Sequence, residues 1–443
     1  MKNIVLTKYA VKGIKTLDKW VELSFYKKTI STPFSIKGYN VKGIYGANGS
    51  GKSAIIISME LLKGILVDSG YLYNPVNQKK LEELVNKKLK SLEFDLEFIA
   101  LITNKRKRYH YSIIIQKNAA GKYYIKKETL SSRNASSRAD NVEKQFEITD
   151  GLIVNLSTSH ENSEMIREQT KNLLGNASFS TIILEKVRPF HQLKFDFIMP
   201  SLFALSLFIY LDSSDEHENF LINSMLSDEK IFGEEELYES FKHNYKIRDI
   251  QIYPLSSETM VVEREKYSDF EKQVDLLKEF LRIFKYDLAS ISIDKRIDKD
   301  VYYCNLIMQY PDYSVHAEFE STGIKKLIKL FPYLQKMVQG DIVFIDELDS
   351  NLHDVYLCAL LEHLMEYGEG QLCFTTHNIG PMDILKTNKK SIEFLSVDHS
   401  IYSWVNNGNY SPSKLYRNGM IEGSPFNVDA LDFLGVFELG EDE

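Results

Sequence analysis

Cysteine is scarce in this sequence, and no apolar run is long. The three cysteines among 443 residues, Cys304, Cys358 and Cys373, lack the spacing of a metal site. So few cysteines exclude a disulfide-rich secreted scaffold and favour a reduced, cytoplasmic setting. The most apolar run, Phe197 to Leu211, is shorter than the ~20 residues of a membrane-spanning helix. We therefore expect a buried helix there, and no membrane partner. The lysine-rich first residues predict no signal peptide.

Positive charge is concentrated in one part of the chain. Residues 1–150 hold 27 Lys and Arg against 14 Asp and Glu, whereas the remainder holds 27 against 48, giving a net charge of −8. A basic region can attract nucleic acid. It can equally pair with the acidic part of its own or a neighbouring subunit, and both readings stay open. The basic stretch 103–108 has the same two readings, with a solvated hairpin tip favoured.

Periodicity predicts an α/β fold assembled from both ends of the chain. Short strands precede residue 46, and alternation of polar and apolar residues over 91–130 indicates an antiparallel meander. The polar stretch 130–145 is expected to be a loop. Helical patterns dominate from 161 to 285, including an amphipathic helix over 268–284. The predicted regions are an N-terminal lobe (1–160), a helical insertion (161–285) and a C-terminal lobe (286–443).

The stretch "GANGSGKS", residues 46–53, matches the phosphate-binding pattern G-x-x-x-x-G-K-[ST] in full. It follows a predicted strand and precedes a predicted helix, which is the context this loop requires. Glycines allow backbone N–H groups to curl around phosphate oxygens, and the helix directs its positive dipole end at them. Lys52 would reach the β- and γ-phosphates of ATP, and Ser53 would ligate Mg²⁺. The predicted nucleotide-binding residues are Gly46, Asn48, Gly49, Ser50, Gly51, Lys52 and Ser53.

A second stretch, "DIVFIDEL" at 341–348, supplies carboxylates. Its apolar residues, 342–345, predict a buried strand with two acids at its end. Asp346 would hold the metal ion, and Glu347 would take a proton from the attacking water. Asp346 and Glu347 could also be two solvated acids at a strand terminus. The presence of a phosphate-binding loop in the same chain makes this simpler interpretation the weaker one.

Two further elements have both a functional and an ordinary reading. "ESTGIKKL" places Ser321 and Gly323 at a helix start, where they either bind the γ-phosphate of another subunit's nucleotide or form a plain helix cap. "LCFTTHN" places His377 at the end of an apolar strand, where it either senses the γ-phosphate or is a neutral surface histidine.

These motifs, with "LDSNLH" after the acids, resemble the heads of ABC-type ATPases such as RecF, RecN and SMC proteins. The resemblance is closer to the OLD-like group often called AAA15, and covers roughly 1–130 and 285–425. It implies two ATP molecules held between head-to-tail subunits, hence a homodimer or a higher even oligomer. It also implies that Ser321 and Gly323 act across the interface, that Asp349 lies at the dimer seam, and that His377 is a switch residue.

The chain also departs from these relatives. The 66 residues after His377 contain no D-x-D pair for a Toprim nuclease, and no heptad repeat predicts coiled-coil arms. An ATPase without its own effector resembles the ATPase components of bacterial anti-phage systems such as PARIS and abortive-infection systems. The leading hypothesis is therefore a sensor and scaffold that controls a separate nuclease or toxin and responds to a phage trigger protein.

The sequence leaves two alternatives open. A RecF-like DNA-maintenance ATPase would bind duplex DNA through the basic N-terminal part, with an affinity that falls steeply with salt. In the second alternative, the chain is itself a nuclease with an unrecognised catalytic centre. Cleavage of plasmid or tRNA in the presence of a divalent metal ion would reveal this activity.

Overall fold

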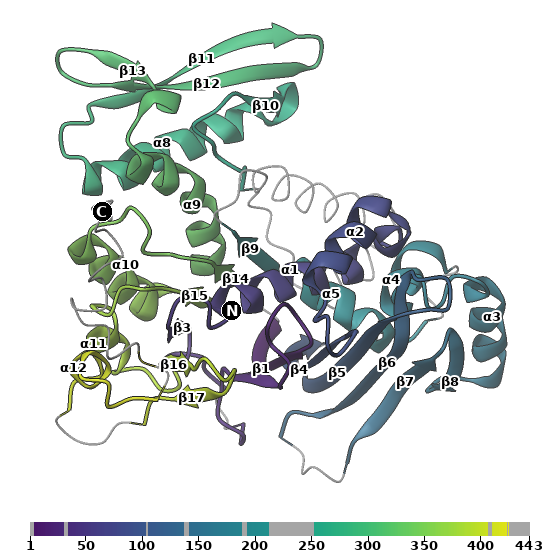
Figure 1. The fold of residues 1–443 in the computed structure, drawn as a ribbon. Coiled ribbons are helices and arrows are strands. Elements are labelled where there is room, and N and C mark those ends of the chain that lie inside the picture. Colours follow the sequence, from purple (N-terminus) through teal and green to yellow (C-terminus); the bar gives the residue numbers. More distant parts are fainter. Residues whose placement is uncertain are drawn as a thin grey trace, which may run out of the picture.

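Three sheets organise the part of the chain that the structure describes (Figure 1). The structure is a computed structural model, and it describes residues 4–30, 34–102, 105–136, 141–187, 193–211, 252–405, 410–422 and 424. The fold is mixed α/β, with antiparallel and mixed sheets. Within these described residues, no helix is both long and apolar enough to cross a membrane.

The first sheet is antiparallel throughout, and it contains the predicted meander as three neighbouring strands, β4, β5 and β6. Side chains alternate along these strands between a buried face and a solvated one. In spatial order its strands are β2 (Val21–Ser24), β1 (Ile4–Lys12), β4 (Ser91–Ile102), β5 (Lys105–Lys117), β6 (Tyr123–Asn134), β7 (Glu143–Thr149) and β8 (Leu152–Leu156).

The second sheet holds the predicted motif strands, and five of its six strands are parallel. The strand before the glycine-rich loop, β3, and the strand before the acids, β14, have β15 between them. In spatial order its strands are β17 (Ile401–Ser403), β16 (Ile392–Leu395), β3 (Val41–Gly46), β15 (Gln371–Thr375), β14 (Ile342–Ile345) and β9 (Leu207–Tyr210).

Helix α1 (Lys52–Val67) lies between these two sheets, as its place at the centre of Figure 1 shows. Twelve of its sixteen residues are buried, because it packs on apolar side chains of both sheets. Gln371 also joins the sheets, since its amide accepts from the N–H of Leu6 (2.8 Å) and donates to the C=O of Leu6 (2.9 Å). The strand-loop-helix unit around the loop is thus fixed on both sides.

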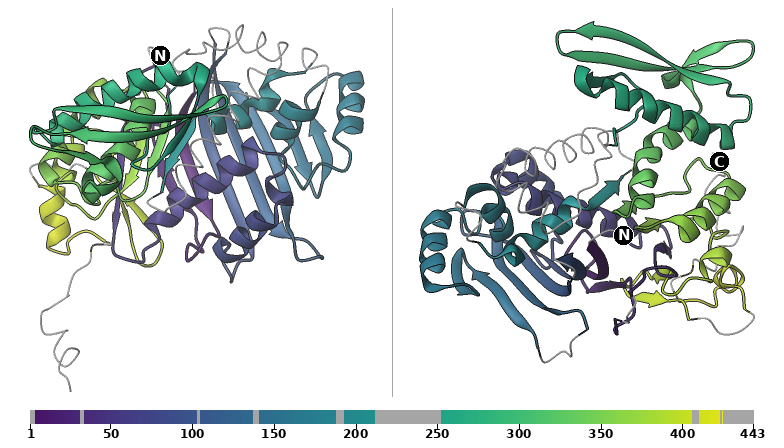
Figure 2. Two further views of the ribbon diagram at one scale, coloured as in Figure 1. Left: turned by 90° about the horizontal axis from the view of Figure 1, so that it is seen from above. Right: turned by 180° about the vertical axis from the view of Figure 1, so that it is seen from behind.

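A small sheet stands apart from the seven-stranded sheet, with α8 beneath it (Figure 2). Its strands are β10 (Met260–Glu263), β12 (Val301–Gln309), β11 (Ser290–Asp298) and the short β13 (Ser314–His316). The remaining helices are α2 (Pro75–Leu84), α3 (His160–Thr170), α4 (Phe179–Lys186), α5 (Met199–Leu205), α8 (Tyr267–Phe284), α9 (Thr322–Val338), α10 (Asp354–Tyr367), α11 (Met382–Leu385) and α12 (Pro412–Arg417).

Three local predictions need correction. The run 197–211 is not one helix, because α5 ends at Leu205 and β9 then joins the parallel sheet beside β14. The stretch 130–145 is not all loop, since β6 continues to Asn134 and β7 begins at Glu143. Of the basic stretch 103–108, residues 105–108 lie in β5, where all four pair with β4 and Lys107 and Arg108 also pair with β6, while 103 and 104 lie outside the described residues. In each case pairing with a neighbouring strand overrides the local pattern.

Candidate nucleotide-binding site

The loop 46–51 connects β3 directly to α1, as the sequence predicts. Gly49 and Gly51 have positive φ angles of 77° and 103°, which glycine adopts without steric cost. A Cβ on Gly46 would lie 2.4 Å from the C=O of Leu395, so only glycine fits at that close approach. Asn48 and Gly49 are exposed, whereas Ser50 is buried. The sequence therefore forms an open loop at the N-terminus of a buried helix.

Lys52 points back along this loop rather than into solvent. Its ammonium group donates to the C=O of Gly46 (2.9 Å) and of Ala47 (3.1 Å). Burial lowers the pKa of Lys52, and the carboxylates of Asp346, Glu347 and Asp349 act in the opposite direction. The ammonium group of Lys52 thus lies within electrostatic range of three acids of the second motif.

The parallel strands explain why Lys52 and Asp346, which are 294 positions apart in the sequence, lie at the same edge of the sheet. Ile44 is level with Thr375 on β15, and Phe374 is level with Ile345 on β14. Adjacent strands lie about 4.8 Å apart, so β3 and β14 are about 10 Å apart. Their carboxyl ends open at one edge of the sheet, where ligands of parallel sheets bind.

The acids form a tight turn after β14. Thr375 organises its start, since its hydroxyl donates to Asp346 (2.5 Å) and accepts from the N–H of Glu347 (2.8 Å). Asp349 accepts from the N–H groups of His377 (3.3 Å) and Asn378 (3.1 Å). The turn is therefore bound to the end of β15, which brings the backbone of His377 beside Asp349.

Two buried polar atoms at this edge have no hydrogen-bond partner among the described residues. They are the hydroxyl of Ser50 and Oδ1 of Asp349. Burying a polar atom without a partner is unfavourable, so such atoms call for an explanation. A hydroxyl in a glycine-rich loop and a carboxylate oxygen in the turn after β14 suit a phosphate-bearing ligand with its metal ion.

The donor set agrees with Mg²⁺, which prefers oxygen ligands and shares them with phosphates. Ser53, half-buried in the first turn of α1, and Asp346, buried at the end of β14, supply a hydroxyl and a carboxylate. The described residues hold no cluster of three or more His, Cys, Asp or Glu that would bind a metal without other ligands. A Mg²⁺ ion here would depend on the nucleotide for part of its coordination.

The S-T-G segment lies beside the acidic turn of its own chain. Ser321 caps α9 by accepting from the N–H of Ile324 (3.4 Å), and Thr322 donates to Asn351 (3.4 Å). Among the described residues, neither Ser321 nor Thr322 forms a hydrogen bond with the loop 46–53. Ser321 is exposed. Within one chain, the segment therefore acts as the N-terminal cap of α9, and Ser321 and Thr322 are exposed to solvent.

Two contributors were missed from the sequence. Thr375, the first threonine of "TTHN", bridges Asp346 and Glu347. Lys326, inside "STGIKK", donates to the C=O of Glu347 (2.5 Å). Their residue types offered a weak signal, but their role depends on the order of the strands and the path of α9.

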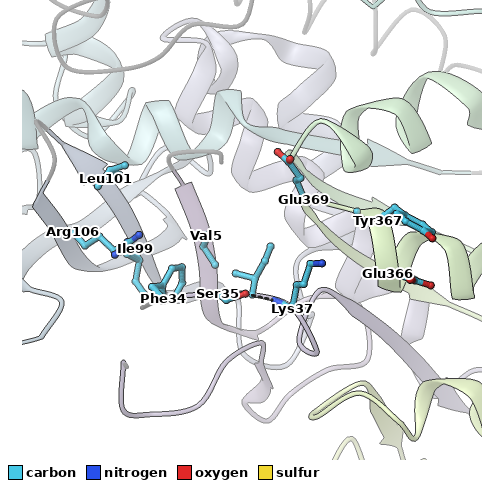
Figure 3. A pocket seen from close by; sticks show the side chains of 12 residues that line it. Val5, Phe34, Ser35, Lys37, Ile99, Leu101, Arg106, Glu366, Tyr367 and Glu369 are labelled. Atoms are coloured by element: carbon cyan, nitrogen blue, oxygen red, sulfur yellow. Dashed lines mark hydrogen bonds between the residues drawn. The ribbon is translucent and has the colours of Figure 1, made fainter. Parts of the chain in front are cut away.

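A cavity of about 300 Å³ lies at the opposite end of β3 (Figure 3). Asn40, just before β3, donates to the C=O of Gly368 in its wall (3.3 Å). Arg106 and Lys37 line different sides of it, around the apolar side chains of Val5 and Ile99. None of the predicted site residues lines this cavity.

Comparison with protein-family models and with curated protein sequences gives no match to this chain. The geometry of the site and the motifs themselves are therefore the basis for assigning a function.

Proposed function

We propose that this chain is a cytoplasmic ABC-type ATPase that acts as a sensor and scaffold in bacterial anti-phage defence. The observation that carries the ATPase part is the meeting of Lys52 with Asp346, Glu347 and Asp349 at one edge of a parallel sheet. The defence part is supported by the resemblance of the motifs to OLD-like ATPases that lack an effector of their own.

The residues divide the chemistry among themselves. The loop N–H groups and Lys52 would bind the phosphates of ATP, and Ser53 and Asp346 would hold Mg²⁺. When bound, Mg²⁺ neutralises charge on the phosphate oxygens. Glu347 would accept the proton of the attacking water, and His377 would contact the γ-phosphate.

Glu347 has a backbone suited to a constrained role. Its φ angle is +48°, in the left-handed region that few residues other than glycine, Asn and Asp adopt. Such backbone is unfavourable by about 1–3 kcal/mol and gathers at functional sites. Its side chain is half-buried, so water reaches it.

The exposed cap of α9 supports assembly into an oligomer. Ser321 and Gly323 would meet the ATP of a second copy, giving a homodimer or a higher even oligomer. A separate nuclease or toxin and a phage trigger protein would be the other partners. A DNA-binding role is not favoured, because basic residues of the first sheet are matched by acids.

The ATPase proposal is tested by Glu347→Gln. We expect ATP binding to be retained and phosphate release to fall about 100-fold or more, because general bases contribute that much. Light scattering should show ATP-dependent dimers accumulating in this variant. Glu22→Gln, on the exposed face of β2, is the matched control. A parental rate for Glu347→Gln would remove Glu347 as the base.

The defence proposal needs a cellular readout. Cells carrying the chain with its neighbouring genes should plate phage poorly, and Lys52→Ala should restore plating. Unchanged plating between cells with and without the locus, across a broad phage panel, would contradict the role in defence.

A further inference from the structure

Lys326 is a buried lysine in the second turn of α9. Only 4% of its surface is exposed. Its ammonium group donates to the C=O of Glu347 (2.5 Å) and contacts the hydroxyl of Ser350. A buried charge requires close hydrogen-bond partners, and Lys326 finds these in the acidic turn, 21 residues further along the chain. The helix that begins with S-T-G is therefore bonded to the backbone of the proposed base.

The peptide groups on both sides of Glu347 are held, each from a different element. Its N–H donates to Thr375 at the end of β15 (2.8 Å), and its C=O accepts from Lys326 in α9. These two bonds restrain φ and ψ of a residue at φ +48°, and so set the direction of its Cα–Cβ bond. If α9 moves, one of these anchors moves while the other stays with the sheet.

The start of α9 packs against the far end of the same turn. A Cβ added to Gly323 would lie 2.6 Å from the C=O of Asn351, so helix and turn touch through their backbones. Asn351 also has a positive φ angle, 61°. The turn 347–351 thus has a left-handed residue at each end, and α9 contacts both ends.

We propose that Lys326 is a positioning residue that couples the start of α9 to the orientation of Glu347. Contact between Ser321–Gly323 and a nucleotide held by a second copy would shift α9, and Lys326 would carry that shift to the peptide of Glu347. Assembly and hydrolysis would then be linked within each chain. This inference rests on the proposed ATPase function, while the anchoring of the turn is a property of the chain itself.

The test compares Lys326→Met, Lys326→Arg and the control Lys325→Met. Methionine keeps the apolar stem of lysine and loses the donor, whereas arginine keeps a donor. Lys325 lies on the same helix, but its ammonium group donates to the C=O of Glu318 instead (3.3 Å). The first readout is amide hydrogen exchange of the peptide that contains 347–351, without nucleotide. We expect about tenfold faster exchange in Lys326→Met and parental exchange in Lys325→Met.

The second readout is steady-state hydrolysis with separate ATP-binding titrations. Lys326→Met should lower kcat about tenfold, leave the ATP Kd within about threefold, and be partly rescued by Lys326→Arg. Parental kcat, or equal losses of kcat and ATP affinity, would overturn the inference. Where Lys326→Met does not fold, Gly323→Ala is the second variant. Its added Cβ would press on the C=O of Asn351, so we expect faster amide exchange of 347–351 without nucleotide, and parental exchange would overturn the inference.

The two readouts separate this inference from the proposed function. A parent chain without hydrolysis would refute the ATPase. Parental exchange in Lys326→Met would refute the anchoring whatever the parent hydrolyses.

Discussion

Basic side chains have different partners in the antiparallel sheet and at the edge of the parallel sheet. On β5, Lys107 pairs with Asp196 (2.7 Å), Arg108 contacts Glu97, and His110 lies 2.6 Å from Asp95. The hydrogen bond to Asp95 raises the pKa of His110, which favours its charged form. These cations are matched by acids of the same fold.

Lys52 has a different environment. It is 6% exposed, its nearest partners are two backbone carbonyls, and burial lowers its pKa. Nearby, Ser50 and Asp349 each bury a polar atom that has no hydrogen-bond partner in the described part of the chain. The basic residues of β5 are therefore held by ion pairs within the fold, whereas Lys52 is held by backbone carbonyls of the loop that follows β3.

A large effect on turnover is expected for Thr375→Val. The substitution keeps the shape of the side chain and removes the hydroxyl that joins Asp346 to the N–H of Glu347. We expect phosphate release to fall about tenfold, since an unsatisfied buried group costs about 1–3 kcal/mol. Thr129→Val, which breaks a hydroxyl pair with Ser112 (2.7 Å) in the antiparallel sheet, should leave the rate unchanged. Equal rates of phosphate release in Thr375→Val and Thr129→Val would contradict the difference between the two sheets.

A smaller effect, on stability alone, is expected for Lys107→Met. Asp196 is 6% exposed and also accepts from Tyr109 (2.6 Å), so removing Lys107 strands part of a buried charge. We expect the free energy of unfolding to fall by about 1–3 kcal/mol, with ATP affinity unchanged. Lys8→Met, which breaks more exposed pairs with Glu22 and Asp95, should cost less than about 1 kcal/mol. Thermal melts measure both, and a larger loss in Lys8→Met would contradict this ranking.

Local sequence predicted the site elements well. The bounds of α1 and β14 agree with their patterns, because a buried helix and a short apolar strand are encoded by consecutive residues. The antiparallel meander was also predicted, since period-two alternation reports a half-solvated sheet. The S-T-G segment was correctly expected at a helix start.

Long-range pairing could not be predicted in the same way. The apolar residues of β9 carry no periodic signal that separates a strand from the end of a helix, and their pairing with β14 decides the outcome. The roles of Thr375 and Lys326 depend on which elements lie beside β14, which no local pattern encodes. Their bonds to Glu347 became visible only with the fold.

The most direct measurement is calorimetric titration of Mg-ATP into the parent chain and Lys52→Ala. The account predicts saturable binding by the parent and at least ~100-fold weaker binding by Lys52→Ala, as expected for loss of a charge-assisted contact worth about 3 kcal/mol. Lys107→Met should bind like the parent. Absence of binding by the parent, or equal affinity in Lys52→Ala, would contradict the claim that this edge of the sheet holds a nucleotide.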